Sequence, residues 1–386
     1  MEKQLIPELR FSDFKDEWKI KKIENILSIG SGKDYKHLQD GVIPVYGTGG
    51  YMTGVDEFLY EGESVCIGRK GTIDKPVFLN EKFWTVDTLF YTHSFKQVLP
   101  RFVYSLFQNI NWYKHNEASG VPSLSKKTIE KINLNIPELP EQQKIASFLT
   151  DVDDKITKLT KKKSLLEQYK KGIMQKIFNQ ELRFKDDDGN VFPKWKTKRL
   201  GDLGSTLNGL TGKTKENFGS GKPYIQYKQI FDSSKINIDN CGLVDITITD
   251  KQTKVQYGDV FFTTSSETPN EIGTASVLLD NVKEMYLNSF CFGFRVNQLD
   301  LYPAFSQFLF RSIDFRKKMI PLAQGSTRYN ISKSAFVKLK VSLPNIEEQT
   351  KIANFLSDID VKIEALNTKI EHSKSFKKGL LQKMFV

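Results

Sequence analysis

The sequence has few residues of the kinds that build crosslinks, metal sites or membrane spans. Its three cysteines, Cys66, Cys241 and Cys291, are scattered, so we expect no disulfide framework. The four histidines lie far apart and form no zinc motif. There is no run of about 18 apolar residues, and the charged N-terminal segment does not resemble a signal peptide. These absences predict a cytoplasmic chain that binds no metal.

Recognisable catalytic motifs are also missing. Residues 30–33 (GSGK) and 209–214 (GLTGKT) resemble phosphate-binding loops, but Leu27 and Leu207 stand where a Walker A motif requires glycine. The GTGG at 47–50 does not match a dinucleotide-binding G-x-G-x-x-G. No Ser-His-Asp signature and no H-E-x-x-H occurs. The sequence therefore favours a binding protein or an adaptor over an enzyme.

The bulk composition is that of a basic globular protein. A chain of 386 residues, 39% hydrophobic and with 28 phenylalanines, predicts two or three domains with real cores. The net charge of +11 favours a polyanionic partner. The charge is diffuse, because 46 acidic residues are interspersed among 57 basic ones.

One segment occurs twice. Residues 141–178 align without gaps with 348–385, at an offset of 207 positions, and 19 of the 38 aligned residues are identical. This period is far longer than a solenoid repeat, so we infer duplication of a domain together with a helix. "ELRF" also occurs twice, at 8–11 and 181–184, each time followed by a Trp-Lys. The order domain, helix, domain, helix is therefore quasi-circular.

Both copies have the alternating four- and three-residue spacing of a coiled-coil helix. A helix over 145–177 would be about 50 Å long at ~1.5 Å per residue. Lys163, Lys170, Ser373 and Lys377 interrupt the apolar pattern. The duplication favours pairing of the two helices, although two helices docked separately on their own domains would have the same periodicity. The predicted seam consists of Ile145, Leu149, Val152, Ile156, Leu159, Leu166, Ile173, Ile352, Leu356, Ile359, Ile363, Leu366, Ile370 and Leu380.

Short strand-like runs between Gly, Asn and Asp turns, followed by helical stretches, predict mixed domains. The expected fold is α+β: two mixed α/β domains joined by two long helices that pair as an antiparallel coiled coil, with pseudo-twofold symmetry. Trp18, Trp195 and the Phe-rich stretches at 102–107 and 305–315 are expected in the cores. The predicted boundaries are 1–140, 141–180, 181–345 and 346–386, for the first domain, first helix, second domain and second helix.

Paired domains, each followed by Pro-(x)n-E-Q-x-K-I-A-x-F-L-x-D-x-D-x-K-I, resemble the specificity (S) subunit of Type I restriction–modification enzymes. The motif lies at Glu141–Ile156 and Glu348–Ile363. Residues 67–73 (IGRKGTI) and 325–344 (GSTRYNISKSAFVKLKVSLP) are similar to elements of that family's target recognition domains. The resemblance covers the whole chain. It departs at 120–126, where GVPSLSK replaces the GSTRYNISK form.

The resemblance implies a non-catalytic subunit that binds no cofactor itself. Each domain would read one half of a split sequence in double-stranded DNA, and the helices would act as a spacer. Two methyltransferase (M) subunits would carry S-adenosylmethionine and methylate adenine N6. Two restriction (R) subunits would use ATP and Mg to cleave DNA. A rod about 50 Å long spans roughly 15 bp at ~3.4 Å per base pair, so lengthening it should lengthen the gap between half-sites.

Polar side chains on glycine-rich loops are the best candidates for DNA contact, because glycine allows close approach and Arg, Lys, Asn, Gln, Ser and Thr read base edges. Arg69 and Arg328 rank first, since guanidinium binds guanine bidentately. The first-domain candidates are Tyr46, Thr48, Tyr51, Arg69, Lys70, Thr72, Ser119, Ser123 and Lys126. The second-domain candidates are Thr211, Lys213, Tyr227, Lys228, Gln229, Thr264, Ser265, Ser266, Ser326, Arg328, Tyr329 and Asn330.

Docking of the M subunits is expected on the polar helix faces and on the "EQ" pairs that begin each helix motif. Two other functions stay open at this point. A coiled-coil adaptor that joins two protein-binding domains would suit the same pattern, but it would show little salt-dependent DNA binding. An enzyme on an unrecognised fold would be active without M or R.

Overall fold

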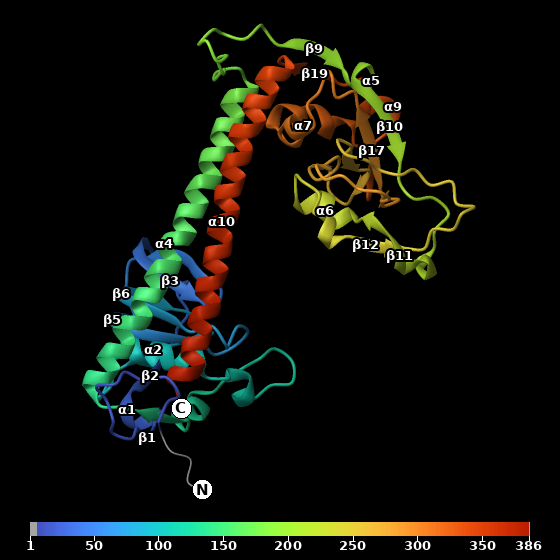
Figure 1. The fold of residues 1–386 in the computed structure, drawn as a ribbon. Coiled ribbons are helices and arrows are strands. Elements are labelled where there is room, and N and C mark those ends of the chain that lie inside the picture. Colours follow the sequence, from blue (N-terminus) through green and yellow to red (C-terminus); the bar gives the residue numbers. More distant parts are fainter. Residues whose placement is uncertain (1–5, 386) are drawn as a thin grey trace. The chain divides into compact units, whose positions relative to one another are not determined.

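The computed structural model describes residues 6–385, so the first five residues of the predicted first domain and Val386 of the second helix segment lie outside it. The chain divides into two compact units, Met1–Lys162 with Leu366–Val386, and Lys163–Ala365 (Figure 1). The predicted long helices are confirmed as α4 (Leu139–Phe178) and α10 (Ile346–Met384). Because the unit boundaries fall inside both helices, each helix contributes to both units. No helix within residues 6–385 is long and apolar enough to cross a membrane.

The first unit contains a mixed α/β domain. Its strands are β1 (Lys19–Lys22), β2 (Ser28–Ser31), β3 (Asp40–Gly47), β4 (Gly50–Val55), β5 (Tyr60–Gly68), β6 (Val77–Thr85), β7 (Leu89–His93) and β8 (Asn133–Ile136). Its helices are α1 (Ile23–Ile26), α2 (Pro100–Asn109) and α3 (Lys126–Glu130). One sheet has the order β2-β7-β5-β6-β3-β4, antiparallel except where β3 meets β6. A second sheet pairs β1 with β8, so the strands that open and close the domain lie together.

The second unit repeats this plan with different interior strands. All the strands of this unit, in chain order, are β9 (Lys196–Arg199), β10 (Gly204–Asn208), β11 (Phe218–Ile225), β12 (Gly242–Val244), β13 (Val260–Thr263), β14 (Ser265–Ser266), β15 (Ala275–Val277), β16 (Tyr286–Leu287), β17 (Cys291–Val296), β18 (Tyr329–Asn330) and β19 (Lys340–Leu343). The helices are α5 (Leu200–Leu203), α6 (Tyr227–Asp232), α7 (Pro303–Leu309), α8 (Ile313–Met319) and α9 (Lys333–Phe336). The sheets are β10-β17-β13-β15, β12-β11-β16, β14-β18 and β19-β9. Again, the opening strand β9 pairs with the closing strand β19.

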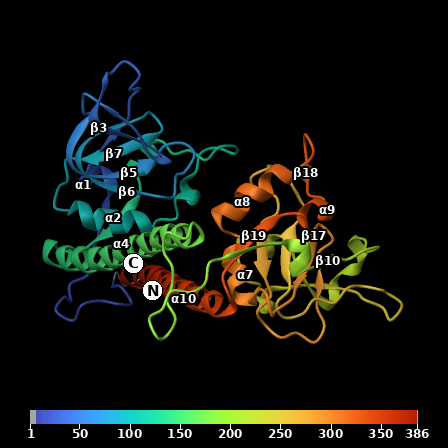
Figure 2. The ribbon, with the colours of Figure 1, turned by 90° about the horizontal axis from the view of Figure 1, so that it is seen from above.

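Each core unites a domain with parts of both long helices. In the first unit, α2 lies between the sheet and α4 (Figure 2). The ring of Phe385, at the end of the chain, lies 6.1 Å from Trp18 and 5.6 Å from Phe102. In the second unit, Phe178 at the end of α4 lies 6.2 Å from Trp195. A buried Phe contributes about 1.5–3 kcal/mol, so these rings anchor each helix end to a domain.

The predicted core residues are confirmed. Trp18 is 2% exposed, and the partly buried Trp195 packs against the second core. Both Phe-rich stretches are also internal, since Phe102 and Phe107 are buried in the first core and Phe305, Phe308, Phe310 and Phe315 in the second.

The seam residues face inward along both helices. Seven of them are buried within a domain core: Ile145, Leu149, Val152 and Leu380 in the first, and Ile352, Leu356 and Ile359 in the second. Leu366 and Ile370 are also buried. Ile156, Leu159, Leu166, Ile173 and Ile363 are half-buried. Mutual pairing and docking on a domain therefore both occur, rather than one of the two.

The "EQ" pairs are internal, so the expectation that they dock a partner is wrong. Glu141 and Gln142 are at most 2% exposed, and Glu348 and Gln349 are fully buried. Gln142 accepts a hydrogen bond from the amide of Leu99 at 2.9 Å, and Gln349 accepts one from the amide of Tyr302 at 2.8 Å, at the N-caps of α2 and α7. In a capping box, a side chain of the helix itself accepts a hydrogen bond from the N-cap amide. Here a glutamine from a different helix makes that contact.

Candidate nucleic-acid interface

Two of the candidate loops in the first domain, 69–72 after β5 and 119–126 before α3, run side by side. The amide of Leu124 donates a hydrogen bond to the carbonyl of Arg69 at 2.8 Å. The neighbouring residues Lys70 and Ser123 form an antiparallel β-bridge. The candidate side chains on these paired loops are Arg69, Lys70, Thr72, Ser119, Ser123 and Lys126.

The tip of the β3–β4 hairpin reaches the same loops. A Cβ atom built on Gly71 would lie 3.7 Å from Oγ1 of Thr48, and the φ of 92° at Gly71 disfavours any side chain there. Tyr51, beyond the tip, is 66% exposed. Tyr46 instead donates its hydroxyl proton to Glu81 at 2.8 Å. Burial and this hydrogen bond raise the pKa of Tyr46 to about 12, so its hydroxyl stays neutral and engaged.

A cavity of about 520 Å³ lies between the paired loops, and its charged lining consists of Arg69, Lys70 and Lys126 together with Glu117. Arg69 and Lys70 are exposed, and the Arg69 guanidinium lies 5.9 Å from the ring centre of Phe90. Lys126 lies 3.7 Å from Glu130, one helical turn further on. The exposed guanidinium of Arg69 on the first loop and the exposed ammonium of Lys126 on the second suit contacts with guanine and phosphate.

The same pairing of two loops recurs in the second domain. Strand β14, just after β13, pairs with β18, just before α9. The amide of Ile331 donates to the carbonyl of Thr264 at 3.1 Å, which corresponds to the Leu124–Arg69 bond of the first domain. In both domains the second loop leads into a short helix and then into the closing strand. The candidates brought together here are Thr264, Ser265, Ser266, Arg328, Tyr329 and Asn330, with the exposed Ser326 nearby in the same loop.

A cavity of about 310 Å³ opens between these loops and α6. Tyr227, from α6, donates its hydroxyl proton to the carbonyl of Ser265 at 2.8 Å, and this bond ties α6 to the first loop. Arg328 lines the cavity and is exposed. Ser266 is 6% exposed and donates to Glu271 at 3.1 Å. The cavity lining thus combines aromatic rings with one guanidinium and two carboxylates.

Several candidates lie elsewhere or have internal partners. Gln229 is 9% exposed and donates to two backbone carbonyls, those of Asn237 and Asn240. The neighbouring Lys228 is exposed, and it pairs with Asp232 at 2.6 Å. We leave Gln229 out of the proposed interface, because its amide already holds the chain that follows α6.

The loop that carries Thr211 and Lys213 does not line the second-domain cavity. The Lys213 side chain is 7% exposed and lies 2.6 Å from Asp250. The hydrogen bond from Lys213 lowers the pKa of Asp250 to about 2. Gln252 bonds the amide and the carbonyl of Thr211. These contacts fasten the loop to residues 247–252, so we also leave Lys213 out.

Three residues of the second-domain cavity were missed by the sequence reasoning: Glu267, Glu271 and Phe290. Glu267 directly follows the candidates Thr264, Ser265 and Ser266, but only the hydroxyl residues of this stretch were chosen. A carboxylate accepts hydrogen bonds from the amino group of cytosine, so its presence there was an available signal. Phe290 is 58% exposed, and only the folded loops place it beside the candidates.

Comparison with known proteins agrees with this geometry. The family model described as "Type I restriction modification DNA specificity domain" matches residues 15–168 and 193–372. The Type I restriction enzyme MjaVIII specificity subunit of Methanocaldococcus jannaschii is 25% identical over 357 residues, covering 84% of this chain and 76% of that protein. A putative specificity subunit of Haemophilus influenzae is 22% identical over 374 residues, covering 89% and 87%.

Solved structures show the same fold. The S subunit from M. genitalium matches with a TM-score of 0.64 at 13% identity and covers 99% of both chains. A structure described under the assembly and conformational transition of the type I R-M system matches with a TM-score of 0.55 at 14% identity, covering 95% and 96%. Since the family model matches most of the chain, once in each half, the chain belongs to the Type I restriction–modification DNA specificity family.

Proposed function

We propose that this chain directs a Type I restriction–modification complex to a split DNA sequence, each domain reading one half-site. The observation that carries the proposal is the pairing of two corresponding loops in both domains, with different side chains on them. Arg69 and Lys70 stand on the first domain's loops, and Ser265 and Arg328 on the second's. One scaffold that presents two sets of donors suits two different base sequences.

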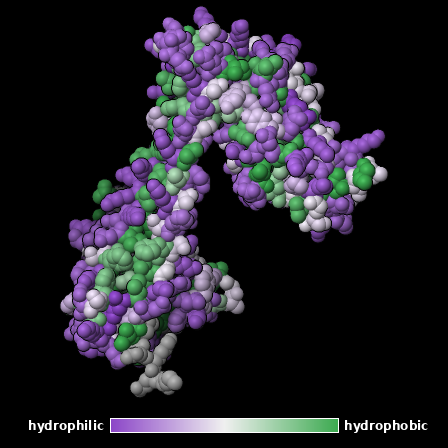
Figure 3. All heavy atoms as spheres, viewed as in Figure 1, coloured by the Kyte–Doolittle hydropathy of each residue, from purple (hydrophilic) through white to green (hydrophobic). Residues whose placement is uncertain are grey.

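The chain itself would supply no chemistry and no cofactor. Two M subunits would carry S-adenosylmethionine, two R subunits would use ATP and Mg, and the complex would work in the cytoplasm. The helices support two copies of one partner, because each has an exposed aromatic residue at the same repeat position. Tyr169 is 51% and Phe376 is 56% exposed, although hydrophilic residues dominate the face seen in Figure 3.

A glycine accompanies each of these aromatics. Gly172 and Gly379 lie three residues after Tyr169 and Phe376, and a Cβ atom on either would meet nothing within 4 Å. A glycine inside a helix costs about 1 kcal/mol relative to alanine, and no contact among residues 6–385 requires one at either position. We infer that an M subunit approaches the helix closely at each glycine and covers the adjacent aromatic ring.

The test is single-molecule sequencing of adenine methylation in cells that co-express this chain with its M subunit. Two short half-sites separated by a fixed gap are expected, and exchange of residues 185–345 should change only one half. If M is active and no split motif appears, the proposal fails. Binding to duplex DNA that barely depends on salt would then favour a protein adaptor.

A further inference from the structure

Among the lysines that interrupt the apolar seam, Lys170 and Lys377 each have an aspartate of the other helix as a partner. The Lys170 ammonium lies 2.5 Å from Asp360, and the Lys377 ammonium lies 2.6 Å from Asp153. The lysine side chains are only 19% and 12% exposed. The duplication offset of 207 relates Lys170 to Lys377 and Asp153 to Asp360. The two ion pairs are therefore the same contact, present once in each unit.

Each ion pair also contacts the helix of its domain that packs on the long helices. The Lys170 ammonium lies 5.1 Å from the ring centre of Phe308 in α7. The Lys377 ammonium lies 5.8 Å from the ring centre of Tyr104 in α2. A cation over an aromatic face is attracted by the ring quadrupole. Each lysine thus joins three elements: its own helix, the opposite helix and the domain.

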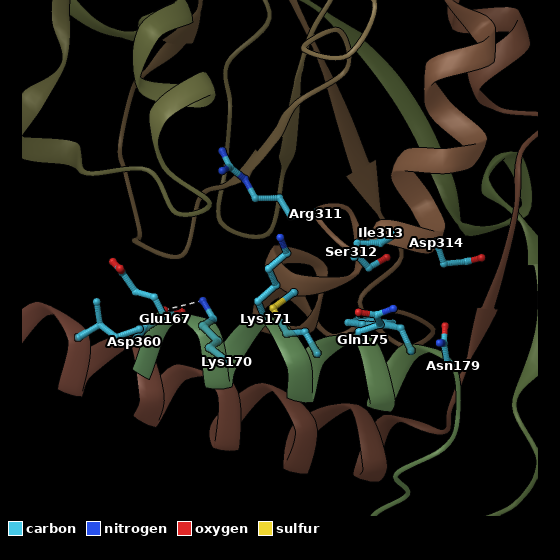
Figure 4. A pocket seen from close by; sticks show the side chains of 13 residues that line it. Glu167, Lys170, Lys171, Gln175, Asn179, Arg311, Ser312, Ile313, Asp314 and Asp360 are labelled. Carbon is cyan, nitrogen blue, oxygen red and sulfur yellow. Dashed lines mark hydrogen bonds and ion pairs between the residues drawn. The ribbon is translucent and has the colours of Figure 1, made fainter. Parts of the chain in front are cut away.

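A cavity adjoins the pair in the second unit. Lys170 and Asp360 face each other at its edge (Figure 4), and its volume is about 380 Å³. The cavity lies between α4 and the corner that joins α7 to α8, and the Arg311 guanidinium at that corner points away from the helices. The end of α4 packs on α7, where the rings of Phe178 and Phe305 lie 5.8 Å apart. Beside the cavity this packing is interrupted, and the Lys170–Asp360 pair lies at that interruption.

Half-buried ion pairs are suited to specifying an arrangement rather than to adding stability. Desolvation offsets most of the Coulomb attraction, so an apolar pair at the same place is often as stable. A polar residue at a single seam position selects the register, because every shifted register leaves the charge without a partner. Here a shifted register would leave one lysine and one aspartate in each unit partly buried without an oppositely charged partner.

We propose that Lys170–Asp360 and Lys377–Asp153 are positioning pairs that hold each domain at one register on the helices, and thereby limit the target to one gap length. This inference rests on the proposed function, since the gap is the distance between half-sites. The pairs lie between the two long helices and not on the candidate loops, so they would act on the gap and not on the bases read at either half-site.

The test uses the complex with the M subunit and the variants Lys170→Met and Lys377→Met, singly and together. Methionine keeps the length and apolar stem of the side chain but has no charge. By methylation sequencing, the ratio of methylation at gaps one base pair shorter or longer to methylation at the original gap should rise at least tenfold. The half-site sequences should stay the same. Lys171→Met and Lys378→Met change exposed neighbours and should leave the ratio unaltered.

The charge-reversed variant Lys170→Asp with Asp360→Lys should restore the single gap, and Lys170→Arg should retain it. A uniform fall in methylation with the gap unchanged would overturn the inference, because loss of folded protein alone gives that result. If the methionine variants do not fold, Asp360→Asn and Asp153→Asn give the same comparison. A wild-type split motif with one gap, kept in all variants, would reject the positioning pairs while leaving the proposed function intact.

Discussion

The guanidinium of Arg183 forms two hydrogen bonds, of 2.7 and 2.8 Å, with the two carboxylate oxygens of Glu348. The same pair occurs in the first unit between Arg10 and Glu141, with both bonds 2.8 Å long. In each unit it ties the "ELRF" segment before a domain to the start of the long helix after that domain. A bidentate pair is strong and directional. In both units it therefore fixes the "ELRF" segment at a defined place on the start of the long helix.

Loss of this contact should destabilise the unit that contains it. Arg183→Ala leaves the carboxylate of Glu348, which is fully buried, without its cation. Breaking a buried pair in this way costs about 3–5 kcal/mol, to be measured by chemical denaturation. Lys19→Ala is the matched control, because the Lys19–Glu138 pair is exposed at 68% and 64%. Because water screens an exposed pair, Lys19→Ala should leave the denaturation midpoint close to that of the wild type; equal losses of stability in the two variants would contradict the argument.

Arg328 and Lys70 should have different effects on DNA recognition. Arg328→Ala removes a guanidinium that can bind guanine edges, so we expect a loss of about 1–3 kcal/mol at one base position of the second half-site. Lys70→Ala should weaken binding to all sequences alike and reduce the slope of log affinity against log salt by about 1. Methylation sequencing and salt titration of the M-containing complex measure the two effects. If both variants relax the same base position, these assignments are wrong.

Bulk at the two helix glycines should block M binding without harming the fold. Gly172→Leu and Gly379→Leu raise helix propensity by about 1 kcal/mol, so the isolated chain should be as stable as the wild type or more so. Each substitution should lower the affinity for the M subunit at least tenfold at the helix surface that carries it. Lys171→Leu places the same side chain on an adjacent exposed position, and it should bind M normally. Unchanged binding by the glycine variants would exclude close approach there.

His93 should make the first domain less stable in acid. Its ring lies among Tyr60 and Tyr91, and its pKa is lowered, first by burial and then by the charge of Lys126. Below the unfolded value of about 6.5, the unfolded chain binds a proton that the folded domain does not, so stability falls as pH falls through this range. His93→Gln should reduce the difference in Tm between pH 7.5 and 5.5. An unchanged difference would assign the effect to other groups.

Much of the architecture could be predicted because its signals are local or repeated along the chain. The seam periodicity identified α4 and α10, and the duplicated "ELRF" and Trp-Lys segments indicated two equivalent units. The roles of individual residues were harder to predict from the sequence. Glu141 and Gln142 look like exposed polar residues at a helix start, yet Arg10 and the cap of α2 bury them. Gln229 looked like a base-reading side chain, but it bonds nearby backbone.

The sequence by itself determined the duplication, the helix pair and the aromatic cores, since repeats, periodicity and apolar content are properties of the chain as written. Only the tertiary structure decided which loops meet. Arg69 and Ser123 are 54 positions apart, as the numbering shows, and Ser265 lies 65 positions before Asn330. Such loops come together only through strand pairing across a whole domain, which depends on the combined packing of many residues and not on any local pattern.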